Sequence, residues 1–232
     1  MNLVMMKSGF KKTPFDVDYT FYIFENIISD VNFNVVSNII KSKEKIILKS
    51  SPRSDNDGDT GLGSDSLTSR FTYYNVLNWE DKNIQKIKNS IVNNINEIYK
   101  KILQEKPINL KIQCWANVMK KGQKIKLHAH NTSNGCLLSG NICVDVDNTY
   151  THYVNPFRWF TTYQRNKSLT RLKSSVHNEI YSSKNEVGKI TLFNSNLPHF
   201  TDEALSDNRI TIAFDIINNT HQQYNNSNYI KL

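Results

Sequence analysis

Residues 188–216 read GKITLFNSNLPHFTDEALSDNRITIAFDI, and apolar and polar residues alternate over the last part of this segment. Successive side chains of a β-strand point to opposite faces of the sheet. A strand at 208–217 therefore has an apolar face and a more polar one. The apolar face holds Ile210, Ile212, Phe214 and Ile216, and the other holds Arg209, Thr211, Ala213 and Asp215.

Residues 137–146, LLSGNICVDV, divide in the same way. Their even positions are apolar, whereas the odd positions carry Leu137, Ser139, Asn141, Cys143 and Asp145. Two strands whose polar faces hold small residues and one arginine predict the lining of a cavity. A sheet with one face in solvent alternates too, so this alternative stays open.

The remaining chain predicts helices first and strands afterwards. An isoleucine stripe with steps of three and four residues predicts a helix over 80–105, which Pro107 ends. A shorter helix is expected at 31–44 and a strand in DYTFYIFENI. Further strands are expected at 108–119, 125–130, 136–147 and 188–194, with a less regular section between 150 and 183. This order of elements predicts an α+β fold with an all-β core.

Composition narrows the class of protein. The 232 residues have a net charge of +8 and three cysteines, whose spacing fits neither a zinc site nor a disulfide framework. No apolar run has membrane-spanning length, so we expect no membrane partner. The charge allows an anionic partner, although a lysine-rich solvated surface explains it as well. Residues 158–175, RWFTTYQRNKSLTRLKSS, make Arg158 and Trp159 candidates for binding an acidic substrate or nucleic acid.

Three histidines and one arginine carry the candidate chemistry. His128 and His130 are two residues apart in a predicted strand, so both project to one face and can chelate one metal ion. His199 follows the strand at 188–194, and Arg209 stands ten residues further on. A lone H-x-H pair is a weak signal, whereas this combination is a strong one.

These motifs resemble those of the iron(II)- and 2-oxoglutarate-dependent oxygenases, in particular a group common in phages and marine bacteria. That group has a W-x-N…G…H-x-H…SG segment before a G-x-L-x-L-F-x-S-x-x-x-H…R-I-S-I-A-F-N-I segment. Here they read WANVMKKGQKIKLHAHNTSNGCLLSG (115–140) and GKITLFNSNLPHFTDEALSDNRITIAFDI. The resemblance covers about residues 108–217.

The resemblance implies a double-stranded β-helix (jelly-roll, cupin-like) core at 108–217. With a mixed, helix-containing part at 1–107 packed on the sheet, it forms one oxygenase domain over 1–218. Residues 219–232 are expected to be a flexible tail. The expected location is the cytoplasm, which for a virus-encoded protein is that of the host.

The resemblance also implies the site. His128 and His199 would bind Fe(II), Arg209 would pair with the far carboxylate of the cosubstrate 2-oxoglutarate, and Thr211 would hydrogen-bond that carboxylate. Asn117 and Ser139 lie near the motifs on inward faces, as candidates for contact with the cosubstrate or as ordinary strand polar groups. The implied reaction hydroxylates a C–H bond and releases succinate and CO2.

His130 departs from the wider superfamily, which has an aspartate or glutamate at this position. We expect His130 to be the third iron ligand, which gives a neutral three-histidine set. Two alternatives remain: a carboxylate such as Asp145 completes the site, or His130 lies outside a two-histidine site completed by water.

Other functions fit the same residues. A cupin-like three-histidine dioxygenase would need no 2-oxoglutarate, but it would leave Arg209 without a role. A zinc site with a bound hydroxide would serve a hydrolase or lyase. A non-catalytic jelly-roll binding protein is the non-enzymatic alternative. The substrate class (small molecule, protein side chain or nucleic acid) and the oligomeric state are left open by the residues.

Overall fold

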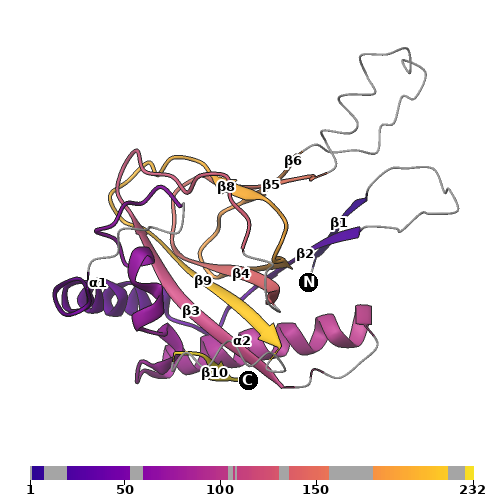
Figure 1. Cartoon of the computed structure of the whole chain (residues 1–232), viewed down its shortest axis with the longest axis horizontal. Coiled ribbons are helices and arrows are strands. Elements are labelled where there is room, and N and C mark those ends of the chain that lie inside the picture. Colours follow the sequence, from indigo (N-terminus) through magenta and orange to yellow (C-terminus); the bar gives the residue numbers. More distant parts are fainter. Residues whose placement is uncertain are drawn as a thin grey trace, which may run out of the picture.

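The computed structural model describes residues 2–7, 20–52, 60–103, 107, 109–130, 136–156, 180–218 and 228–232. Its strands form two antiparallel sheets, a major sheet in the order β1-β2-β7-β4-β9-β3-β10 and a minor sheet in the order β6-β5-β8 (Figure 1). The strands are β1 (Asn2–Lys7), β2 (Thr20–Ile27), β3 (Leu110–Met119), β4 (Cys136–Asp145), β5 (Tyr150–Val154), β6 (Ile180–Lys184), β7 (Lys189–Asn194), β8 (His199–Thr201), β9 (Arg209–Asn218) and β10 (Ile230–Lys231).

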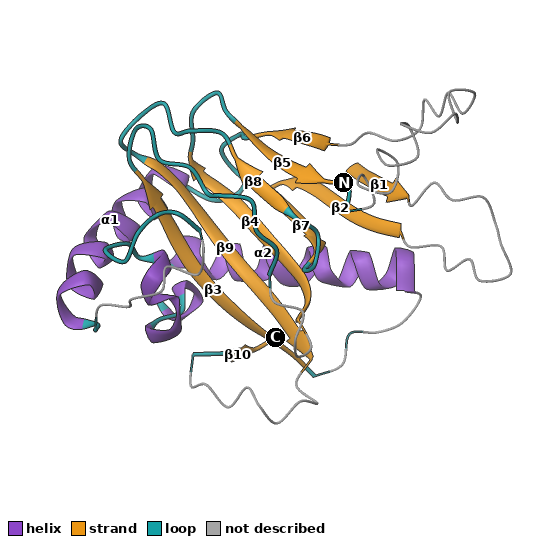
Figure 2. Ribbon diagram, turned by 45° about the horizontal axis from the view of Figure 1, so that its top comes forward, coloured by secondary structure: helices purple, strands orange, loops and turns teal. Residues whose placement is uncertain are grey.

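Two helices, α1 (Phe33–Ser50) and α2 (Lys82–Ile98), pack on one face of the major sheet (Figure 2). The side chain of Asp81 caps α2 by accepting a hydrogen bond from the backbone of Asn83. The isoleucine stripe is buried against the sheet at Ile84, Ile87, Ile91, Ile95 and Ile98. The predicted helix and its packing on the sheet are therefore confirmed. Regular α-helix ends before the predicted 105, because a π-helical turn, η3 (Tyr99–Leu103), follows α2.

The central strands β7, β4, β9 and β3 of the major sheet are largely buried on both faces. The helix-facing side of the sheet belongs to the main hydrophobic core, which includes the even-numbered residues Ile210, Ile212, Phe214 and Ile216 of β9. On the opposite side, Ile23 and Phe193 of the major sheet pack with Tyr153 of the minor sheet and Leu197. The minor sheet therefore covers the face that carries the polar residues of β4 and β9. This confirms the α+β fold with a double-stranded β-helix core.

Some short elements differ from the sequence-based expectation. Residues 125–130 form no strand of either sheet, although a bridge between His128 and His199 and hydrogen bonds between Ile125 and Thr201 link them to β8. The less regular section 150–183 contains β5 and β6, and its central residues 157–179 lie outside the described part. In the predicted flexible tail, Ile230 and Lys231 form β10 against β3, while 219–227 lie outside the described part.

Two 3-10 helices, η1 (Thr68–Tyr73) and η2 (Val76–Asn78), lie against β3. Before them in the chain, Thr60 reaches the space between the two sheets. Among the helices that the structure describes, none has both the length and the apolar character needed to cross a bilayer.

Candidate metal and cosubstrate site

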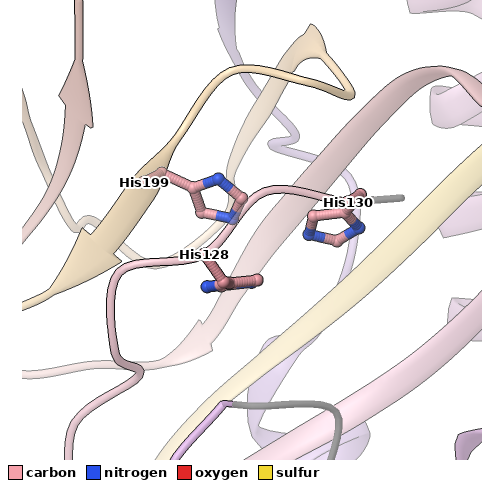
Figure 3. Close-up of side chains that lie close together, drawn as sticks. All are labelled: His128, His130 and His199. Atoms are coloured by element: carbon pink, nitrogen blue, oxygen red, sulfur yellow. The ribbon is translucent and has the colours of Figure 1, made fainter. Parts of the chain in front are cut away.

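The imidazoles of His128, His130 and His199 converge at one end of the space between the sheets (Figure 3). One ring nitrogen of each lies within 4.8 Å of the corresponding nitrogens of the other two. The ring centroids of His128 and His199 are 4.3 Å apart, and that of His130 is 5.2 Å from His199. The bridge between His128 and His199, with backbone hydrogen bonds in both directions, fixes the segment 125–130 beside β8. Side chains separated by seventy residues in the sequence thus meet.

Hydrogen bonds at Nδ1 orient all three rings. Nδ1 of His128 lies 2.8 Å from the carbonyl oxygen of Lys126, and Nδ1 of His199 lies 2.9 Å from that of Leu197. Nδ1 of His130 lies 2.6 Å from Oδ1 of Asp215. Carbonyl and carboxylate oxygens accept, so we assign the ring proton to each Nδ1, and the lone pair is then on each Nε2. This arrangement is typical of histidines that bind a metal through Nε2.

The electrostatic environment keeps His199 neutral. Burial lowers the pKa of His199 well below its ordinary value of 6.5, and the nearby His128 and His130 lower this pKa further. A neutral imidazole is the form that binds a metal ion. Near neutral pH, His199 therefore does not have to lose a proton before the cluster binds a cation.

A small cavity of about 50 Å³ lies next to the imidazoles, between the two sheets. Besides the three histidines, its walls are Thr60, Trp115, Asn117, Ile125, Gly140, Asn141, Thr151, Tyr153, Phe193, Thr201, Arg209, Thr211 and Ala213. The predicted cavity face is confirmed on β9 at Arg209, Thr211 and Ala213, whereas on β4 only Asn141 of the predicted positions lines the cavity.

Arg209 brings a buried positive charge into this cavity. The residue is 0% exposed, and Nη1 donates to the carbonyl oxygen of Asp202 at 2.9 Å. Within the described part of the chain, Nε and Nη2 have no hydrogen-bond partner. Burial lowers the pKa of Arg209 below its ordinary value. Because buried charges are normally paired, a guanidinium with two unpaired nitrogens fits an anionic ligand such as a carboxylate.

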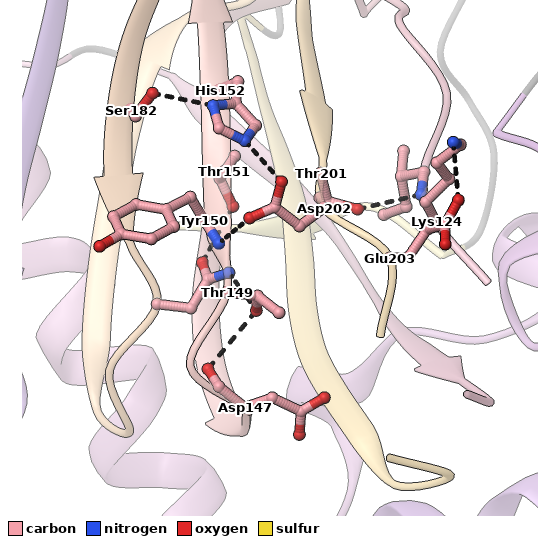
Figure 4. A network of polar contacts seen from close by, with 12 residues as sticks. Lys124, Asp147, Thr149, Tyr150, Thr151, His152, Ser182, Thr201, Asp202 and Glu203 are labelled. Carbon is pink, nitrogen blue, oxygen red and sulfur yellow. Dashed lines mark hydrogen bonds and ion pairs between the residues drawn. The ribbon is translucent and has the colours of Figure 1, made fainter. Parts of the chain in front are cut away.

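A polar network on the outer face of the minor sheet holds Asp202 in place (Figure 4). One carboxylate oxygen of Asp202 contacts Nε2 of His152 at 2.9 Å, and the other accepts from the backbone of Tyr150 at 2.8 Å. Nδ1 of His152 contacts the hydroxyl of Ser182 at 2.8 Å. His152 is therefore half-buried and paired, and its network positions Asp202, whose backbone carbonyl accepts from Arg209.

Thr211 and Asn117 lie together beside Arg209. The amide of Asn117 donates to Oγ1 of Thr211 at 3.3 Å and accepts from the hydroxyl of Thr68 at 2.7 Å. Both Asn117 and Thr211 line the cavity. Because Asn117 occupies a lone pair of Thr211, the hydroxyl hydrogen of Thr211 is left to donate to a ligand.

Ser139 and Asp145 lie elsewhere. The hydroxyl of Ser139 donates to Oδ1 of Asp215 at 2.6 Å, and Ser139 is not among the residues that line the cavity. Asp145 contacts Ser37 and Lys41 of α1, at 3.2 Å and 3.6 Å. A register shift between Cys143 and Asp145 in the pairing of β4 with β9 reverses the alternation, so Asp145 faces the helices. The alternative in which Asp145 completes the metal site is therefore wrong.

Several site residues carried no assigned role in the sequence analysis. Asp215 was only one polar position of β9, and its contact with His130 joins β9 to a segment whose distance along the chain gives no sign of the contact. Tyr153 lies in the section that looked irregular, although its ring is fully buried in the cavity wall. Trp115 stands in the W-x-N motif, which was the available signal. The substrate candidates Arg158 and Trp159 lie outside the described residues.

Comparison with known proteins gives the family. Residues 113–215 match the family model described as "Putative 2OG-Fe(II) oxygenase". No curated protein matches the sequence. Among solved structures, a Pseudomonas putida prolyl-4-hydroxylase superposes with a TM-score of 0.51 at 8% identity, over 84% of this chain and 92% of that one. AviO1 from Streptomyces viridochromogenes has a TM-score of 0.51 at 8% identity, over 87% and 90%.

At such low identity the two structures show a shared fold alone, whereas the family match covers β4, most of β9 and all three histidines. The segment 113–215 of this chain therefore matches the 2OG-Fe(II) oxygenase family, whose description names Fe(II) and 2-oxoglutarate.

Proposed function

We propose that His128, His130 and His199 bind one ferrous ion and that Arg209, with Thr211, binds the far carboxylate of 2-oxoglutarate in the adjacent cavity. The chain would then hydroxylate a C–H bond of its substrate. The observation that carries this proposal is the buried guanidinium with two unpaired nitrogens beside three converging imidazoles. Neither feature stabilises the protein by itself, because a buried charge and a cluster of imidazoles both cost free energy without a ligand.

The donor set suits the proposed ligands. Imidazole nitrogens are suitable ligands for Fe(II), so His128, His130 and His199 would hold the ion. Bound iron and 2-oxoglutarate supply the oxidising chemistry, in which decarboxylation to succinate and CO2 accompanies transfer of one oxygen atom to the substrate. The protein's own part is to hold three lone pairs and one guanidinium in place before the ligands arrive.

The walls of the cavity support the same function. Trp115, Tyr153 and Phe193 place aromatic rings around the histidines, and the ring centroid of Phe193 is 4.7 Å from that of His199. Apolar walls exclude water, which strengthens the pairing of Arg209 with a carboxylate. They also limit side reactions of an oxidising centre. The substrate is expected to be a small molecule, a protein side chain or a nucleic acid that presents a C–H bond at this cavity.

Metal binding by protein purified without oxygen tests the proposal first. We expect one Fe(II) per chain, and a stoichiometry close to zero for His199→Ala. The outer-face variant His152→Gln is the matched control and should keep the metal. Bound zinc in place of iron, or full occupancy in His199→Ala, would contradict the assigned site.

Cosubstrate turnover tests the second half of the proposal. Slow formation of succinate is expected only when Fe(II), 2-oxoglutarate and dioxygen are all present, and it can be followed by NMR even before the substrate is known. Oxygen uptake that needs a substrate but no 2-oxoglutarate would instead favour the cupin-like three-histidine dioxygenase.

A further inference from the structure

Asp215 is joined to the candidate metal site by two short hydrogen bonds. Its Oδ1 lies 2.6 Å from Nδ1 of His130 and 2.6 Å from the hydroxyl of Ser139. Both distances are at the short end for their type, as expected when one partner is charged. The contacts join β9, β4 and the segment that carries His130, and Ser139 is fully buried. The geometry thus fixes Asp215 directly behind one ring of the cluster.

Among the described residues, the carboxylate of Asp215 contacts the ring of His130, and no lysine or arginine forms an ion pair with it. Two thiols lie nearby, and their pKa values are raised first by burial and then by the carboxylate of Asp215, to about 12 for Cys136 and well above the ordinary value for Cys114. A cation bound by the three histidines would therefore interact with the carboxylate of Asp215 through the ring of His130.

Two departures from the family pattern meet at this contact. His130 stands where the wider superfamily has a ligating carboxylate. Asp215 stands where the related motif, R-I-S-I-A-F-N-I, has asparagine, whereas this chain reads RITIAFDI. In the structure these two residues lie within hydrogen-bond distance of each other: Nδ1 of His130 is 2.6 Å from Oδ1 of Asp215.

We propose that Asp215 is a positioning residue that orients His130 and supplies, one imidazole away from the metal, the negative charge that a ligating carboxylate supplies elsewhere in the superfamily. This inference rests on the proposed function. Fe(II) with three neutral imidazoles keeps a charge of two, but with two imidazoles and a carboxylate it keeps a charge of one. Adding Asp215 to the three-histidine set returns the total to one. A carboxylate behind a ligating histidine also makes the ring a stronger ligand.

Metal affinity measured at fixed pH tests the role of Asp215 without any need for turnover. The probe is Co(II), titrated into apo-protein by calorimetry and by its visible absorption. Asp215→Asn keeps the size of the side chain and a hydrogen-bond acceptor but removes the charge. We expect it to weaken Co(II) binding about 10- to 100-fold, the usual effect of losing such a partner. Asp145→Asn, the same change on the helix-facing side of β4, should leave the affinity unchanged.

A double variant shows whether Asp215 acts through its negative charge or only through its packing. His130→Asp alone places two carboxylates side by side and should bind Co(II) more weakly than the wild type. Combined with Asp215→Asn, it leaves one carboxylate, now as a direct ligand, and should recover most of the lost affinity. If the role of Asp215 were only structural, the double variant would not recover affinity for Co(II).

Two results can be distinguished. If the wild type binds no metal through the three histidines, the proposed function fails. If the wild type binds Co(II) but Asp215→Asn binds it equally well, only the role of Asp215 is overturned. Melting temperatures of the apo-proteins, measured alongside, show whether a variant has lost affinity through loss of folding.

Discussion

The two faces of the major sheet are both largely buried at its central strands, yet they are built from opposite kinds of residue. On β9, the helix-facing positions Ile210, Ile212, Phe214 and Ile216 are all 0% exposed and wholly apolar. On the cavity face of the same strand, Arg209 is equally buried, and two of its nitrogens lack a partner in the described part of the chain. One face therefore stabilises the fold, while the other holds polar groups at a cost that only a ligand offsets.

This comparison predicts that substitutions on the two faces have separable effects. A change on the cavity face should alter ligand binding and leave the free energy of unfolding of the apo-protein nearly unchanged. A change on the helix face should do the reverse. The variants below are ordered by the size of the expected effect.

Arg209→Met should have the largest effect on binding. The proposed pairing of the guanidinium with a carboxylate is lost, and truncating one partner of a buried charge pair costs about 2–5 kcal/mol, which corresponds to a loss of roughly 30-fold or more in affinity. Calorimetric titration of 2-oxoglutarate into the metal-loaded protein measures this effect. The apo-protein should melt at the same temperature or higher, because an unpaired buried cation is removed. Unchanged affinity for 2-oxoglutarate would show that the cosubstrate pocket lies elsewhere.

Ile212→Ala tests the helix face at a position between two cavity-facing residues. Removing a fully buried isoleucine side chain should lower the free energy of unfolding by about 2–5 kcal/mol, through lost apolar burial and the cavity left behind. Urea denaturation measures this loss. The metal stoichiometry of the folded fraction should stay that of the wild type. The neighbouring variant Thr211→Val is the comparison: it should weaken 2-oxoglutarate binding and lower the free energy of unfolding by only about 1–3 kcal/mol, because it leaves the amide of Asn117 unpaired.

Gly140→Ala adds a methyl group to the helix face of β4. A Cβ at this position would lie 2.3 Å from Cζ of Phe214 and 2.6 Å from the carbonyl oxygen of Thr191, both too close. Overpacking of this kind typically costs about 1–3 kcal/mol, and urea denaturation is again the measurement. Phe214→Leu should cost less in the Gly140→Ala background than in the wild type, because it removes one of the two clashes. If the two variants were simply additive, the close packing of Gly140 on Phe214 would be disproved.

The features that the sequence predicted well are those set by periodicity. The isoleucine stripe of α2 repeats about every 3.6 residues and the alternation of β9 every two residues, and both periods follow from backbone geometry alone. The H-x-H pair and His199 were expected to lie together, and the structure brings them together.

The features that the sequence did not predict depend on tertiary pairing. The strands β5, β6 and β8 are three to five residues long, too short to give a clear period, and they are held by their neighbours in the minor sheet. The segment 125–130 is extended because β8 and Thr60 bind its backbone, without its joining either sheet. The contact of Asp215 with His130 depends on how two distant segments approach, which spacing along the chain does not encode.

The irregularity in β4 is the clearest such case. Strict alternation places Asp145 on the same face as Asn141 and Cys143, where it could reach a metal. The register shift after Cys143 instead pairs Asp145 with Ile210, a residue of the helix-facing core. A bulge adds one residue to one strand, so every position beyond it changes face. One local irregularity therefore decides whether this carboxylate belongs to the site or to the helix interface.

Asp145→Asn should accordingly have the smallest effect of these variants. The carboxylate makes a partly exposed ion pair with Lys41 and accepts a hydrogen bond from Ser37. Exposed pairs of this kind contribute about 0–1 kcal/mol, so the free energy of unfolding should fall by no more than that, and less at high salt. Because the side chain faces α1, metal and 2-oxoglutarate affinities should equal those of the wild type. A weakened metal site in Asp145→Asn would mean that β4 continues its alternation without the shift and that the boundary between the two faces lies elsewhere.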